Sequence, residues 1–185
     1  MKKTRAAAIA VIILACVGLG TYLVVRKQSP PPLPRPVMHE PAGSPVKVNI
    51  YRIAFEGDEA KLRAVEVEVP AGRDPAEAAL RRLIQKGDEG DLVNPIPRGT
   101  RLLSLEVKDG LATVDLSREF SDNFTGGSED EALTIGVILR TLGQFSEIKK
   151  VLFKLEGQPL DTLGHLDLSG PQDVNWVGTG LGSSN

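Results

Sequence analysis

Residues 101–117, RLLSLEVKDGLATVDLS, contain two strand-like runs joined by Asp109 and Gly110. An Asp-Gly pair is a favoured two-residue turn between antiparallel strands. If Lys108 pairs with Leu111, one face of the resulting hairpin is apolar and the other is polar. The apolar face then comprises Leu103, Leu105, Val107, Ala112, Val114 and Leu116. This stretch therefore predicts a hairpin with one side packed on a core.

Two further strands and a helix are predicted before this hairpin. Residues 46–51 and 65–69 alternate apolar and polar side chains, which is typical of half-buried strands, and the two form a first hairpin. Asp74, followed by Pro75 and Glu77, marks a helix start. The aspartate can cap free backbone N–H groups, and proline fits the first helical turn because no donor is needed there.

A second helix is predicted after the 101–117 hairpin. Ser128 and Glu131 have the spacing of a capping box, and no charged residue lies between Glu131 and Arg140. Apolar side chains therefore surround most of this helix. Two interpretations stay open. The helix is either part of the core, covered by sheet and tail, or contacts a partner through Val137 and Leu139.

A last strand at residues 151–155 completes the order strand, strand, helix, strand, strand, helix, strand. This order predicts an α+β domain over residues 46–177. Its expected architecture is a mixed, mostly antiparallel sheet with two helices packed on one face, preceded by a transmembrane helix. Residues 178–185 are expected to form a flexible tail.

The amino terminus, residues 1–27, is predicted to be a signal anchor. Basic residues precede an uncharged stretch at residues 6–25, and a helix of about 20 residues crosses about 30 Å of hydrocarbon. A cleaved signal has a shorter apolar region, so an uncleaved single-pass anchor is favoured, with the rest of the chain outside the cell membrane. Cys16 leaves lipidation open as an alternative. It is the only cysteine, so the domain that follows can form no disulfide or thiolate zinc site.

Residues 28–45 contain seven of the 13 prolines, which predicts an extended spacer between anchor and domain. Six basic side chains and one acidic side chain fall in residues 1–45. Because the whole chain carries a net charge of −2, the remainder carries −7. An acidic domain has no basic surface for nucleic acid, so we expect no nucleic-acid partner.

The candidates for catalysis are few and acidic. Asp115 and Glu119 could form the carboxylate pair of a wall-glycan hydrolase, provided that one of their pKa values is raised. The acids of this region lack the spacing of a calcium loop, and neither histidine lies near a recognisable triad. Tyr51 and Trp176 could stack on sugars, which leaves peptidoglycan binding as an alternative. We expect no enzymatic activity, cofactor or metal.

The order of several short motifs resembles the GerMN domain family, which is associated with sporulation and spore germination. The first motif is in the first helix, the second precedes the 101–117 hairpin, the third runs from its turn to just beyond it, and the last residues lie at the start and the end of the second helix. The matching residues are Glu77, Ala79, Leu80 and Leu83; Pro97, Gly99, Thr100 and Leu102; Gly110, Val114, Asp115, Leu116, Ser117 and Phe120; and Gly126, Gly127, Ser128, Glu131, Thr141, Leu142 and Phe145.

The resemblance covers nearly all of the predicted domain and implies an extracytoplasmic, membrane-tethered bacterial module without enzymatic activity. Family members are linked to assembly of a transenvelope complex during sporulation. The implied role is interaction or scaffolding in the cell envelope, and the implied partners are envelope proteins or a second copy of the chain. One departure is Asp88, which stands where family members often have proline.

Overall fold

The computed structural model describes residues 44–176. The predicted anchor with Cys16, nearly all of the predicted spacer and the predicted tail lie outside this range, so these three predictions remain predictions. Within the described range, no helix combines the length and the apolar character needed to cross a membrane.

The first sheet has the order β2-β1-β3 and is antiparallel throughout. Its strands are β1 (Val46–Glu56), β2 (Glu59–Val69) and the short β3 (Leu92–Val93). The predicted first hairpin is confirmed and is longer than expected. Its register runs without interruption from the pair Val46 and Val69 to the pair Glu56 and Glu59. Gly57, with a φ of 65°, makes the tight turn.

The second sheet has five strands and mixed pairing, with the order β4-β5-β6-β7 and β8 also paired to β6. The strands are β4 (Leu102–Lys108), β5 (Leu111–Leu116), β6 (Lys150–Leu155), β7 (Gln158–Pro159) and β8 (Gln172–Asp173). Strands β5 and β6 are parallel, and the other pairs are antiparallel.

The hairpin of β4 and β5 confirms most of the predicted register. Lys108 pairs with Leu111, as predicted, and the two following pairs agree as well. A bulge between Leu102 and Ser104 then shifts the pairing, so that Leu102 lies opposite Leu116. Leu103, which was predicted to face Leu116, is instead 44% exposed. The extra residue of a bulge reverses the side-chain alternation beyond it.

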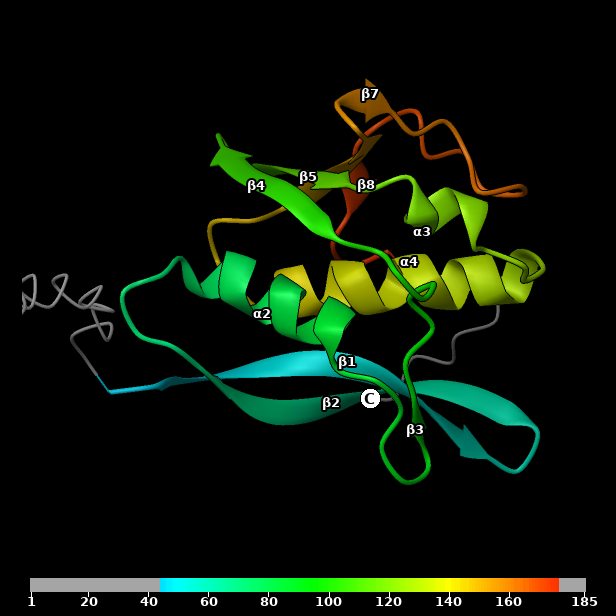
Figure 1. The fold of residues 1–185 in the computed structure, drawn as a ribbon, viewed down its shortest axis with the longest axis horizontal. Helices are drawn as coiled ribbons and strands as arrows, with labels where there is room; N and C mark the ends of the chain where they lie inside the picture. The colour runs from blue at the N-terminus through cyan, green and yellow to red at the C-terminus, as the bar shows by residue number, and fades with distance from the viewer. Residues whose placement is uncertain (1–43, 177–185) are drawn as a thin grey trace, which may run out of the picture. The chain divides into compact units, whose positions relative to one another are not determined.

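The prediction of one sheet covered on one face by two helices is wrong. The helices α2 (Pro75–Gln85) and α4 (Ser128–Leu142) form a middle layer between the two sheets, as Figure 1 shows. A short helix, α3 (Glu119–Asp122), follows β5. A helix that is apolar on most sides needs cover on more than one side, and two sheets provide it.

The burial of α4 decides between the two interpretations of its apolar surface. Val137 and Leu139 are both 0% exposed and belong to the hydrophobic core. Their predicted role in binding a partner is therefore not supported, because neither offers a surface in the folded domain. The helix contacts β1 on one side and lies beside α2.

The start of α2 is capped as predicted. Asp74 Oδ1 accepts hydrogen bonds from the backbone N–H groups of Ala76 at 2.8 Å and Glu77 at 3.0 Å. Pro75 occupies the first turn, where its missing donor is not needed. This cap fixes the point at which the chain turns from β2 into the helical layer.

We expect Asp74→Ala to lower the free energy of unfolding by about 1 kcal/mol, because two N–H groups of the first turn lose their acceptor. Urea unfolding of the purified chain, followed by the fluorescence of its single tryptophan, measures this loss. Asp91→Ala is the matched control, since Asp91 is an exposed aspartate outside any helix. Equal midpoints for the two variants would contradict the role of the cap.

Candidate functional site

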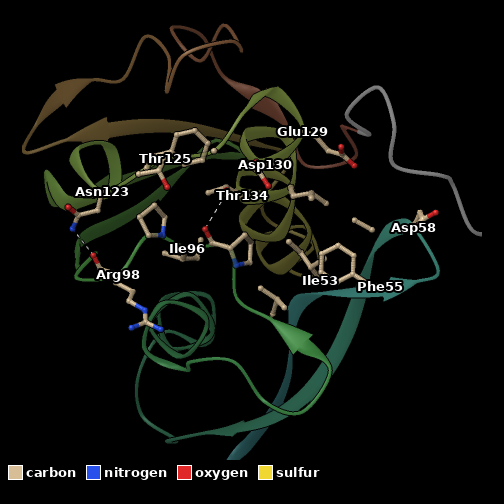
Figure 2. A pocket seen from close by; sticks show the side chains of 17 residues that line it. Ile53, Phe55, Asp58, Ile96, Arg98, Asn123, Thr125, Glu129, Asp130 and Thr134 are labelled. Carbon is tan, nitrogen blue, oxygen red and sulfur yellow. Dashed lines mark hydrogen bonds between the residues drawn. The ribbon is translucent and has the colours of Figure 1, made fainter.

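A cleft opens at the end of the domain where the turn of β1 and β2 approaches the start of α4 (Figure 2). Its volume is about 580 Å³, within the range of pockets that bind small ligands or parts of larger ones. Four segments supply its lining, namely residues within 53–60, 93–98, 123–126 and 129–134. We call it the α4 cleft.

Apolar side chains supply the buried part of the lining of the α4 cleft, and polar groups supply much of its exposed part. Ile53, Ile96 and Leu133 are buried at its base. Two aromatic side chains add to the lining: Phe55 is 60% exposed and Phe124 is half-buried. Phe55 is the most exposed of the large apolar side chains in the described range. An exposed aromatic side chain beside a concave surface can contribute apolar contact area to a bound partner.

Hydrogen bonds between separate segments hold the walls of the cleft in place. Asn123 Nδ2 donates to the carbonyl of Arg98 at 2.8 Å, and Thr134 Oγ1 donates to the carbonyl of Pro95 at 3.3 Å, both visible in Figure 2. Asn94 Nδ2 ties the same segment to α2 through the carbonyls of Leu83 and Lys86. The segment 93–98 is thus fixed on both sides.

Carboxylates dominate the polar rim. Asp58 in the β1–β2 turn and Glu129 and Asp130 in the first turn of α4 line the cleft, whereas Arg98 is the one basic residue of its lining. Asp130 Oδ2 accepts from the backbone N–H of Gly127 at 3.0 Å. The positive end of the helix dipole favours Glu129 and Asp130. The rim is therefore acidic and will attract cationic groups.

Gly126 is required by the close approach of the 123–126 loop to α4. A Cβ atom at this position would collide with the side chain of Asp130. The glycine therefore permits the loop to pack directly over the first helical turn, which closes one side of the cleft.

The structure gives the predicted hydrolase pair structural roles. Asp115 is half-buried on β5 and accepts a hydrogen bond from the backbone N–H of Gly157 at 3.0 Å. Glu119 pairs with Arg101 at 3.2 Å. Hydrogen bonding with the Ser117 side chain, helped by Arg101, lowers the pKa of Glu119. A general acid needs a raised pKa, so the shift runs against Glu119 as the acid of such a pair.

Glu131 was assigned to a capping box, and this assignment is wrong. The N-cap is Gly127, which has no side chain to complete the box, and Asp130 supplies the returning acceptor. Glu131 is 0% exposed and accepts from the backbone N–H groups of Leu163 at 2.9 Å and His165 at 2.7 Å. His165 Nδ1 lies 3.3 Å from the same carboxylate. Through these hydrogen bonds, Glu131 links the loop after β7 to α4.

The other candidates of the sequence do not assemble into a site. Tyr51 and Trp176 are half-buried and packed against the core. Between residues 44 and 176, no group of three or more histidine, aspartate or glutamate side chains is placed to hold a metal ion. Sequence reasoning missed the α4 cleft. The one available signal was Phe55, an aromatic residue next to a turn.

A protein-family model described as "Sporulation and spore germination" (Germane) matches residues 49–161. The match includes α2, α3 and α4, nearly all of the first sheet, and the second sheet except β8. It also includes all residues that line the α4 cleft. No curated protein matches the chain.

Solved structures agree with this match. One is a "Putative Lipoprotein" from Clostridium perfringens, with 26% identity, a TM-score of 0.51 and coverage of 70% of this chain and 88% of that one. Another is the first GerMN domain of the sporulation protein GerM from Bacillus subtilis, with 25% identity, a TM-score of 0.56 and coverage of 69% and 96%.

The tandem GerMN domains of the same Bacillus subtilis protein match with 26% identity and a TM-score of 0.57. Here 70% of this chain is covered but only 46% of the tandem structure. The chain therefore spans about half the length of the tandem structure.

Proposed function

Because this chain belongs to the Germane family of sporulation and spore germination domains, known as GerMN domains, we propose that it is a membrane-anchored interaction module on the extracytoplasmic side of the bacterial envelope. In this role it holds a partner in place so that an envelope complex can assemble. The proposed partner is an envelope protein or a second copy of the chain. The complex is proposed to serve sporulation or germination.

The α4 cleft carries the proposal. Its walls are fixed by hydrogen bonds between segments, and Phe55 keeps an apolar surface exposed at its edge. Preformed concave surfaces with an exposed aromatic side chain supply binding energy without a large ordering cost. Three other large apolar side chains of the described surface are exposed, each to a smaller fraction than Phe55. They are Val46, Leu103 and Val107.

Two further observations support the location and the class of function. The name of the Clostridium perfringens neighbour describes a lipoprotein, and lipoproteins are held at a membrane. The Bacillus subtilis neighbours are domains of a sporulation protein. Asp115 and Glu119, the predicted hydrolase pair, make hydrogen bonds and an ion pair within the fold, and the pKa of Glu119 is lowered. A binding role therefore accounts for the domain better than glycan cleavage.

Site-specific photocrosslinking in intact cells tests the proposal. We expect a benzophenone amino acid placed at Phe55 to yield a crosslinked product that contains one defined partner or a second copy of the chain. The same probe at Leu103, which is similarly exposed but lies on β4 away from the cleft, is the control and should yield much less product. Equal yields at the two positions, or no product at either, would contradict an interaction through the cleft.

Peptidoglycan binding is separated from this proposal by cosedimentation of the chain with purified wall. Retention by the wall that is lost in Phe55→Ala would assign the cleft to wall material rather than to a protein partner. Absence of cosedimentation together with a protein crosslink at Phe55 supports the interaction module.

A further inference from the structure

We propose that the α4 cleft binds a cationic polypeptide segment of its partner, in which an apolar side chain enters the cleft beside Phe55 and a nearby lysine or arginine pairs with Asp58 and Glu129. This inference rests on the proposed function and names the chemistry of the partner. It follows from the exposed Phe55 beside the cleft, from the charge of the rim and from the arrangement of the two.

The apolar side chains of the lining, above all the exposed Phe55, favour an apolar anchor on the bound segment. Ile53, Ile96 and Leu133 offer no hydrogen-bonding side-chain atoms, so a polar group placed against them would lose its contacts with water. Phe55 gains most from such an anchor, since 60% of its surface is still in contact with solvent. Aromatic side chains that become buried in this way commonly dominate the binding energy of an interface.

The acidic rim favours a positive charge on the bound segment, close to its apolar anchor. Glu56 and Glu59, which flank the β1–β2 turn, both pair with Lys61, at 2.8 and 3.5 Å. Asp58 lies in the same turn, yet neither Asp58 nor Glu129 has an ion-pair partner among the described residues. Their charge therefore remains available to a partner, and it repels phosphates and other anions.

The charged groups of the rim are unevenly distributed along the cleft. In Figure 2, Asp58 and Glu129 lie toward one end of the cleft, and Arg98 and Asn123 lie toward the other. The Arg98 guanidinium has no carboxylate partner within residues 44–176, so it can donate to a carbonyl or carboxylate of the bound segment. A polypeptide suits this arrangement, because its backbone supplies acceptors at one end while a basic side chain meets the acids at the other.

Selection from a library of random 12-residue peptides on the immobilised full chain tests the inference directly. We expect the selected peptides to be enriched in lysine or arginine within a few positions of an aromatic or aliphatic residue. Phe55→Ala should weaken the binding of these peptides about ten-fold or more, the usual loss for a central aromatic contact.

Charge reversal supplies the decisive variant. Asp58→Lys combined with Glu129→Lys should weaken the selected peptides at least ten-fold, mainly through a slower association rate, because attraction is replaced by repulsion. The control is Glu106→Lys combined with Glu147→Lys, which changes the net charge equally at exposed positions outside the cleft. It should alter the affinity less than two-fold. The circular dichroism spectrum of each variant is compared with that of the unchanged protein to check that the variant is folded.

Selected peptides without basic residues would overturn the inference, and so would equal weakening by both charge reversals. A library that yields no binder above background would also overturn it. A crosslink at Phe55 that persists under any of these results would leave the interaction module standing with a partner of different chemistry. Loss of the crosslink itself would remove the proposed function instead.

Discussion

Val137→Asp is expected to unfold the domain. Val137 is 0% exposed in the middle of α4, between two sheets, and an aspartate there would place an unpaired charge in the core. The cost of such a charge exceeds about 4 kcal/mol, a large part of the 5–15 kcal/mol that stabilises a typical domain. Loss of the far-ultraviolet circular dichroism spectrum and a shift of the Trp176 fluorescence measure the effect.

Val107→Asp is the matched control for this result. It introduces the same side chain in place of the same residue, but Val107 is 37% exposed on the edge strand β4. The charge there can remain hydrated, so we expect a folded protein with a loss of less than about 1 kcal/mol. A folded Val137→Asp variant would contradict the burial of α4 and reopen the interpretation of this helix as a contact surface.

Glu131→Ala is expected to lower the free energy of unfolding by about 3 kcal/mol. The buried carboxylate accepts from the N–H groups of Leu163 and His165, and neither donor would keep a partner after truncation. A donor that loses its acceptor where water has limited access costs about 1–3 kcal/mol, and the two donors lie in a partly buried region. Urea unfolding measures the global loss, and amide hydrogen exchange should show faster exchange at residues 163 and 165.

Glu129→Ala is the control for the Glu131 result. Glu129 is two residues earlier in the same helix but is exposed, and it has no hydrogen-bond or ion-pair partner in the described part of the chain. Its removal should change stability by no more than about 0.5 kcal/mol. Similar losses for both variants would show that Glu131 acts only through the helix dipole and does not fasten the loop.

Local sequence signals predicted the local structure well. The Asp109–Gly110 turn identified the hairpin of β4 and β5 and most of its register, and Asp74 with Pro75 identified the start of α2. Each of these signals acts within a few residues, through turn geometry or through a cap. The structures they specify do not depend on the rest of the fold.

The assignment of strands to sheets could not be predicted in the same way. The alternation in β1 and β2 shows that each strand has one buried face, but it does not show which sheet contains the strand. One sheet and two sheets therefore fit the same pattern. The strands β3, β7 and β8 have only two residues each, too few for any periodicity.

The α4 cleft was missed because its lining comes from four segments that are distant in the sequence. Glu131 was missed for a related reason. Its position near a helix start fits a cap, and its true partners lie more than 30 residues later in the chain. Non-local hydrogen bonds of this kind leave no local motif, so only the folded structure reveals them.

The position of β1 determines how the domain would respond to mechanical tension. The chain enters the domain at Val46, and β1 is the central strand of the first sheet. A pull on the chain from its amino-terminal side acts along β1, at right angles to its hydrogen bonds with β2. The eleven-residue strand is then loaded in shear, so its hydrogen bonds share the force instead of opening one after another. A domain pulled from this end would resist extraction of its first strand.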